Sequence, residues 1–173
     1  MTPGELLVRT DSLMAGYSKR PDATAAAIDA DGWYHTGDEV RFRDDGNMVF
    51  VGRLSDMFKS GGCNVYPREI ELCLEDHPAV ALAAVVGVAD EVFDEVGRAH
   101  LLLDHPVSTD EPLDHCRTHL ANYGPTWPIP DPPGQLRTHR ANYKVPKRII
   151  LHDTLPMLAV SKIDKVALRR IPV

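Results

Sequence analysis

The chain has 173 residues, of which 43% are hydrophobic, and a formal net charge of −6. This length suits one ordinary domain or two small ones, and the hydrophobic share is large enough for a packed core, which argues against a disordered chain. Acidic and basic residues are interspersed, which excludes the broad basic face of a general nucleic-acid or anionic-membrane binder.

The first third of the chain is predicted to form strands. Residues 4–10 (GELLVRT) alternate in polarity as a strand does, and Pro21 begins a short alanine-rich helix. Residues 40–53 are the clearest β-hairpin, because two alternating runs flank an Asp45-Gly46 turn.

The pattern changes after this hairpin. Residues 66–78 form an amphipathic helix whose apolar side chains recur at helical spacing; they are Ile70, Cys73, Leu74 and His77. The later expected elements are strands at 79–88 and 98–104, a helix at 111–123, a strand at 147–151 and a helix at 161–170. In that last helix, Ile163, Val166 and Ala167 are expected to face the core.

A domain boundary is predicted near Asp56, where the composition shifts. The part before it, residues 1–56, has too few strands to close its own core, so it is expected to be an incomplete β subdomain. Residues 57–173 alternate helix and strand, which predicts a small α+β domain with a sheet covered by helices.

One stretch is repeated. RTHLANY at 117–123 recurs as RTHRANY at 137–143, and a proline-rich insert near 124–134 separates the copies. Prolines exclude regular structure in this insert. A local duplication that adds a mobile surface loop is favoured, because such insertions cost little loop entropy; a proline-rich docking site is the alternative.

No apolar run reaches the length of a membrane span, and residues 1–10 lack the pattern of a secretory signal. The three cysteines include no C-x-x-C pair, so we expect reduced thiols and a cytoplasmic protein. Cys63 has no histidine placed by a motif to activate it, which makes an inert thiol the default.

Asp38 ends the stretch DGWYHTGD and is the first candidate for binding chemistry. A carboxylate at such a turn can accept two hydrogen bonds from neighbouring ribose hydroxyls, with the preceding aromatic residues packing the turn. The hairpin could bring Arg53 to the same rim, where it would contact a phosphate or sugar oxygen. The alternatives are a turn-capping aspartate and an ordinary surface ion pair.

Lys162 lies on a short loop before the final helix and could place a positive charge on a developing negative one. The alternative is one of many surface lysines, and the same holds for Lys59 as a phosphate contact. His115 and His119 are spaced as a helical metal pair, but no third ligand is placed near them, so no metal site is predicted.

Five stretches resemble, in order and spacing, the C-terminal third of acyl-CoA synthetases. They are GELLVRTDSLMAGY, DGWYHTGDEV, DDGNMVFVGRLSDMFKSGGCNVYPREIE, HPAVALAAVVGVADE and LPMLAVSKIDKVALRR. These enzymes belong to the AMP-forming adenylating superfamily, with luciferases and the adenylation domains of peptide synthetases. The resemblance implies that residues 1–56 end a large N-terminal domain, as part of an antiparallel β-barrel, and that residues 57–173 are its C-terminal lid.

The resemblance also implies roles for matching residues. Asp38 would bind the ribose hydroxyls of ATP and of the acyl-adenylate, and Arg53 would contact the same nucleotide. Lys162 would be the catalytic lysine of adenylation, in which a carboxylate attacks the α-phosphate of ATP and releases pyrophosphate. Mg²⁺ is expected with ATP, although no ligand for it is identified in this chain.

In the second half-reaction of the family, a thiol attacks the acyl-adenylate. The lid first rotates about a hinge, here Asp56, so that the lysine leaves and the strand around Gly61 and Gly62 lines the pantetheine channel. Glycines suit this position because backbone must approach a thin ligand closely. The stretch SGGCNVYPREIE is more similar to acyl- or aryl-CoA ligases than to peptide synthetases, which favours CoA as the thiol.

Two departures qualify the resemblance. Ser161 stands where the family usually has glycine before the lysine, which would strain the backbone if φ is positive there. The phosphate loop, the adenine motif and the acyl pocket lie upstream in the family and are missing here. We therefore expect the C-terminal fragment of an ATP-dependent acyl-CoA ligase, such as those of fatty acid metabolism, that is inactive without its N-terminal domain.

Two other functions stay open. One is a free-standing, lid-like nucleotide- or protein-binding module that acts on another chain, and the other is a generic α+β interaction domain. An exposed edge of the half-barrel could also pair two chains into a homo-oligomer.

Overall fold

The computed structural model describes residues 3–120 and 143–172. The chain divides into two compact units, Met1–Ser55 and Asp56–Val173. The predicted proline-rich insert near 124–134, with the mobility expected of it, lies outside the described residues. The interpretation of the two units as the end of a larger domain and a lid stays a prediction.

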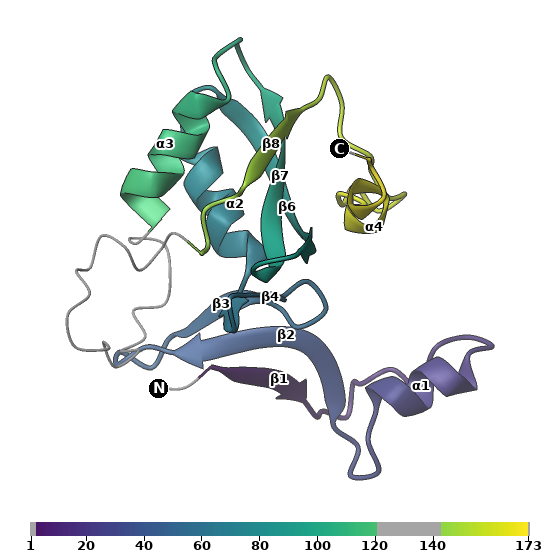
Figure 1. Ribbon diagram of the computed structural model, residues 1–173. Coiled ribbons are helices and arrows are strands. Elements are labelled where there is room, and N and C mark those ends of the chain that lie inside the picture. The colour runs from purple at the N-terminus through teal and green to yellow at the C-terminus, as the bar shows by residue number, and fades with distance from the viewer. Residues whose placement is uncertain (1–2, 121–142, 173) are drawn as a thin grey trace. The chain divides into compact units, whose positions relative to one another are not determined.

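The first unit contains one small antiparallel sheet and one short helix (Figure 1). The strands run in the order β1-β2-β3, with bounds Gly4–Val8, Tyr34–Phe42 and Met48–Arg53. Helix α1 covers Pro21–Ala27 and begins at the predicted proline. The predicted hairpin is confirmed, and Gly46 takes a φ of +81° in its turn, a conformation that favours glycine.

The second unit is built on a five-stranded sheet. Four of its strands have the order β5-β4-β7-β6, and the fifth, β8, pairs in parallel with β7. The strands are β4 (Phe58–Ser60), β5 (Cys63–Val65), β6 (Val80–Asp90), β7 (Asp94–Leu103) and β8 (Arg148–Leu151). The helices are α2 (Pro67–Glu75), α3 (Asp110–His119) and α4 (Lys165–Arg169).

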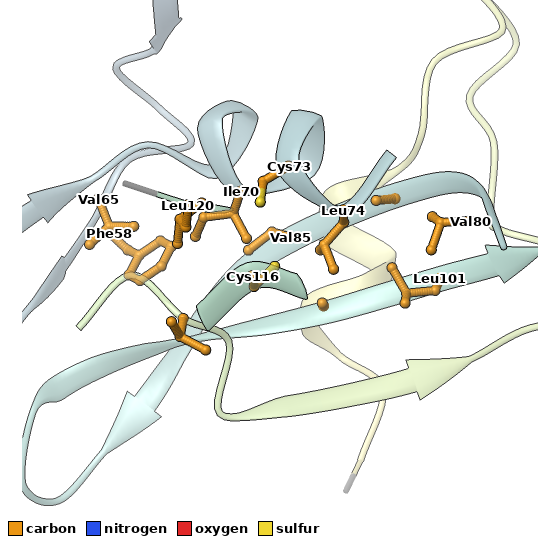
Figure 2. Close-up of a cluster of buried hydrophobic side chains, with 13 residues drawn as sticks. Phe58, Val65, Ile70, Cys73, Leu74, Val80, Val85, Leu101, Cys116 and Leu120 are labelled. Atoms are coloured by element: carbon orange, nitrogen blue, oxygen red, sulfur yellow. The ribbon is translucent and has the colours of Figure 1, made fainter. Parts of the chain in front are cut away.

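Two apolar clusters lie on opposite faces of this sheet because successive strand residues point to opposite sides. Val85 joins Ile70, Leu74 and Cys116 in the cluster under α2 and α3 (Figure 2). Val86 belongs to the second cluster, whose buried members also include Ala84, Leu155 and Leu168 and which packs α4. The described strands form open sheets, and the predicted α+β class is confirmed.

Phe58 anchors the short strand β4 against the centre of the sheet. A Cβ atom at Gly87 would lie 2.5 Å from the Phe58 Cβ, whereas one at Gly97 would lie 3.4 Å from the Phe58 Cζ. Only a glycine at position 87 leaves room for the aromatic ring. Phe58 thereby fixes the strand that carries the Gly61-Gly62 turn.

Three details of the sequence-based description are corrected. Strands β4 and β5 were not identified from the residue pattern, because three-residue strands carry too little alternation to be recognised, and the strand that the resemblance implied around Gly61 and Gly62 is a turn between them. The last helix begins at Lys165 rather than at residue 161. It buries Leu168 and leaves Val166 55% exposed, so the predicted inward position of Val166 was wrong, whereas Ile163 packs against the second cluster as predicted. Within the described part of the chain, no helix is both long and apolar enough to cross a membrane.

Candidate nucleotide-binding and lid residues

Asp38 and Arg53 lie opposite each other on β2 and β3. Arg53 Nε is 2.9 Å from Asp38 Oδ1, so the hairpin brings the two residues to one rim as predicted. Although the charges are close, Asp38 Oδ1 is covered and accepts no well-directed hydrogen bond. The Asp38 side chain as a whole is 28% exposed, so the carboxylate stays accessible from the side that Arg53 does not cover.

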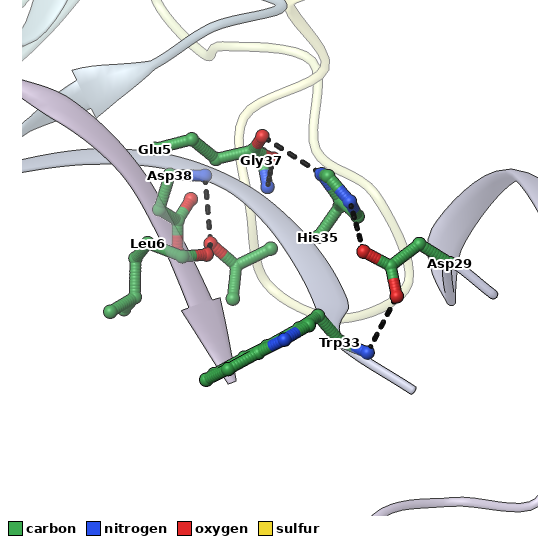
Figure 3. Close-up of polar contacts among 8 residues, drawn as sticks. Glu5, Leu6, Asp29, Trp33, His35, Gly37 and Asp38 are labelled. Atoms are coloured by element: carbon green, nitrogen blue, oxygen red, sulfur yellow. Dashed lines mark hydrogen bonds and ion pairs between the residues drawn. The ribbon is translucent and has the colours of Figure 1, made fainter. Parts of the chain in front are cut away.

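Trp33 and Tyr34 were predicted to pack the Thr-Gly-Asp turn, but they also contact residues outside it. The guanidinium of Arg9 lies 4.4 Å from the centroid of the Trp33 ring, and the Tyr34 hydroxyl is 3.4 Å from that of Tyr17. Instead, Gly37 N–H of the Thr-Gly-Asp turn donates to Glu5, and His35 contacts the other carboxylate oxygen of Glu5 (Figure 3). Neither residue was identified from the sequence, since Glu5 lies in the distant strand β1.

Lys162 lies in a tight turn between the last described strand and α4. Leu158 N–H donates to Lys162 O at 2.7 Å, and Ser161 N–H donates to Leu158 O at 3.0 Å. Ser161 has a φ of +57°, so this position does adopt the left-handed conformation. The Lys162 side chain is exposed, and no ion pair joins it to another described residue.

Gly61 and Gly62 form the turn between β4 and β5, with φ values of +55° and +79°. Gly61 N–H donates to Phe93 O at 2.9 Å, and a Cβ at Gly61 would lie 3.4 Å from the Phe93 ring. No atom lies within 4 Å of a Cβ built at Gly62. The turn therefore requires glycine for its backbone conformation, and at Gly62 it presents open backbone.

Asp56, the predicted hinge, is the first residue of the second unit. Its Oδ2 lies 3.5 Å from Lys165 Nζ, which is also 2.6 Å from Oε1 of the buried Glu71. Lys165 follows Lys162 by less than one helical turn. Sequence reasoning missed this link, because no local pattern connects α2 to the C-terminal helix.

The remaining candidates show no arrangement for catalysis or metal binding. The His115 and His119 rings stack with centroids 4.1 Å apart. No group of three or more candidate metal ligands occurs within residues 3–120 and 143–172. Cys63 is partly exposed and free, and Lys59 is exposed on β4.

Comparisons with known proteins relate the chain as a whole to one group of enzymes. Residues 69–128 match the family of AMP-binding enzyme C-terminal domains. Over 168 residues the chain is 40% identical to the 3-[(3aS,4S,7aS)-7a-methyl-1,5-dioxo-octahydro-1H-inden-4-yl]propanoyl:CoA ligase of Mycobacterium tuberculosis. This match covers 97% of the chain and 30% of that relative. The chain belongs to the adenylate-forming superfamily and corresponds to its C-terminal portion.

Two further comparisons give the same assignment. The chain is 39% identical to a feruloyl-CoA synthase of Amycolatopsis, covering 96% of the chain and 30% of that protein. The o-succinylbenzoate CoA synthetase of Bacillus subtilis, solved with its acyl-adenylate intermediate, is 32% identical with a TM-score of 0.80. That similarity covers 99% of this chain and 31% of the other. The chain therefore spans about 30% of the length of the curated relatives it matches.

Proposed function

We propose that the chain is the C-terminal part of an AMP-forming ligase that activates a carboxylic acid as its adenylate and transfers the acyl group to CoA. The relatives described above are named for three different acids, a bicyclic propanoate, a ferulate and a succinylbenzoate. The proposal therefore extends to carboxylic acids as a class and names no individual acid.

The observation that carries the proposal is the placement of Lys162. Its ammonium is exposed at a turn that two backbone hydrogen bonds hold, and it is engaged by no ion pair among the described residues. A flexible lysine side chain on a fixed backbone can neutralise the charge that develops when a carboxylate attacks the α-phosphate of ATP. We assign Lys162 this catalytic role in adenylation.

Asp38 and Arg53 would hold the nucleotide. The partly exposed Asp38 carboxylate would accept hydrogen bonds from ribose hydroxyls, and Arg53, held 2.9 Å from it, would contact a neighbouring oxygen. Mg²⁺ would accompany ATP. Because the described residues contain no group of three or more candidate metal ligands, we assign it no ligand from this chain.

Thioester formation would use other residues of the second unit. Gly62 presents backbone with open space around it, which suits the thin pantetheine arm of CoA. Asp56 would be the hinge about which the second unit turns between the two half-reactions, so that Lys162 and the Gly61-Gly62 turn serve the same substrate in succession. The cytoplasm, where ATP and CoA are available, would be the site of the reaction.

The decisive experiment separates the two half-reactions. The chain is joined to the N-terminal portion of the B. subtilis o-succinylbenzoate CoA synthetase, and each half-reaction is measured in the resulting chimera. Lys162→Ala is expected to lower ATP–pyrophosphate exchange by about 100-fold or more. Thioester formation from supplied acyl-adenylate should stay within a few-fold, because the lysine has left the site by then.

Arg170→Ala is the matched control, since it removes a positive charge from the same segment at an exposed position. It should leave both half-reactions unchanged. An equal loss of both half-reactions in the Lys162 variant would contradict the assignment. The unmodified chain alone should show no exchange with any carboxylate in a panel, and measurable exchange would refute its dependence on an N-terminal portion.

A further inference from the structure

Strand β2 carries an insertion where it passes β1. Glu5 pairs with Glu39 and Leu7 pairs with His35, so one residue of β1 faces three residues of β2 between these pairs. The three are Thr36, Gly37 and Asp38. A bulge of this kind removes backbone groups from the ladder and redirects the side chains on the bulged strand. The carboxylate of Asp38 therefore depends on how the bulge is held.

Side chains replace the missing ladder hydrogen bonds. The Thr36 hydroxyl donates to Leu6 O at 2.8 Å and accepts from Asp38 N–H at 3.0 Å. Gly37 N–H donates to Glu5 Oε1 at 3.0 Å, while Gly37 itself has a φ of +71°. Of these partners, only Glu5 comes from outside the bulged strand through a side chain, so it ties the turn to β1.

The carboxylate of Glu5 is itself fixed by a second contact (Figure 3). His35 Nδ1 lies 3.0 Å from Glu5 Oε2, and His35 Nε2 lies 3.5 Å from Asp29 Oδ2. Asp29 Oδ1 accepts from Trp33 N–H at 2.9 Å, which anchors this carboxylate to the start of β2. Both oxygens of Glu5 are thus engaged, one by the bulge and one by the imidazole.

The contact also affects the protonation of these groups. The hydrogen bond to Glu5 raises the pKa of His35, with a smaller contribution from Asp29, and the hydrogen bond from His35 lowers the pKa of Glu5. Glu5 on β1 and Asp29 before β2 are the charged groups that face His35 among the described residues. Both pKa shifts favour a charged imidazole between the two carboxylates at the start of the turn.

We infer that Glu5 is a positioning residue for the Asp38 carboxylate and that His35 holds Glu5 in place. The inference rests on the proposed function, in which Asp38 binds the ribose of a nucleotide. Glu5 acts through the Gly37 amide and touches no substrate. A free turn would sample several directions of the Asp38 side chain, whereas the held turn presents one, which lowers the entropy lost on ligand binding.

The test uses the complete chain labelled with ¹⁵N for hydrogen exchange, and the chimera with the B. subtilis N-terminal portion for titration with 5′-AMP as the probe. Hydrogen exchange of the Gly37 amide reports on the bulge, and AMP titration reports on the nucleotide site. Glu5→Ala should speed exchange at Gly37 by about tenfold and weaken AMP binding by a similar factor, as expected for losing one hydrogen bond to a charged group. Asp44→Ala, an exposed carboxylate of the same unit, should change neither.

Glu5→Gln separates positioning from folding. Its amide oxygen can still accept from Gly37 N–H, so exchange and AMP affinity should remain close to wild type, while the pKa of His35 should fall toward its ordinary value. Unchanged exchange in Glu5→Ala, or an unmoved His35 pKa in Glu5→Gln, would overturn the inference. If the wild-type chimera binds no AMP while Gly37 behaves as expected, the ribose site is refuted and the role of Glu5 in holding the bulge is retained.

Discussion

Lys165 Nζ lies 2.6 Å from Oε1 of Glu71, an ion pair that joins the C-terminal helix to α2. The side chain of Glu71 is 6% exposed and that of Lys165 is 20% exposed, so the pair is largely removed from water. The same Glu71 oxygen accepts from Val85 N–H at 3.0 Å, which ties the central sheet into the contact. The helix that follows Lys162 is thus fixed to the body of the second unit.

Replacing Lys165 should destabilise the second unit. Lys165→Met leaves the buried Glu71 carboxylate without its nearest cation, and we expect a loss of about 2–3 kcal/mol in the free energy of unfolding. Lys162→Met makes the same chemical change at an exposed side chain and should stay within about 0.5 kcal/mol. Urea unfolding of both variants measures the difference, and equal effects would show that the ion pair is not stabilising.

The sequence could not have revealed this pair, because the partners lie on elements far apart in the chain and no spacing rule links them. It did predict features that short-range patterns determine. The Asp45-Gly46 turn sets the β2–β3 register as far as the Val40–Phe50 pair, and a register shift between Glu39 and Val40 then places Asp38 opposite Arg53. Likewise, helical spacing identified Ile70, Cys73 and Leu74, which are fully buried in α2.

The candidate site also combines residues that the sequence predicted with residues that only the structure reveals. Positions such as Gly61 and Lys162 were identified by motif resemblance, and the structure supplies their backbone conformation. The contribution of Glu5 was missed because it depends on a bulge register between β1 and β2, and the composition of either strand does not specify it. The bulge can be recognised only once both strands are paired.

Ser161 should be a site of stored backbone strain. Its φ of +57° is unfavourable for a residue with a Cβ, so Ser161→Gly should stabilise the second unit by about 0.5–1 kcal/mol. Ala159 lies in the same turn without a positive φ, and Ala159→Gly should destabilise by a similar amount because glycine gains freedom in the unfolded chain. In thermal unfolding, a higher melting temperature for Ser161→Gly and a lower one for Ala159→Gly would support the strain at Ser161. A lower melting temperature for both variants would contradict it.

A buried histidine, His100, lies on the face of the sheet that packs α4 and contacts the partly buried His152. His100 Nδ1 is 2.8 Å from His152 Nε2, and His100 has no exposed surface. Burial, followed by the nearby charges of Arg98 and His152, lowers the pKa of His100 from 6.5 to about 4. The folded protein therefore keeps His100 neutral where the unfolded chain would protonate it.

This difference predicts a loss of stability in acid. As the pH falls below 6.5, the unfolded state takes up a proton at His100 and the folded state does not until about pH 4, so stability is full above 6.5 and declines between these values. His100→Phe should remove up to about 3 kcal/mol of this decline. Exposed His105 provides the control, since His105→Gln should leave the profile unchanged. Urea unfolding between pH 4 and 7 measures the effect, and a His100→Phe profile parallel to wild type would show that His100 is protonated in the folded state.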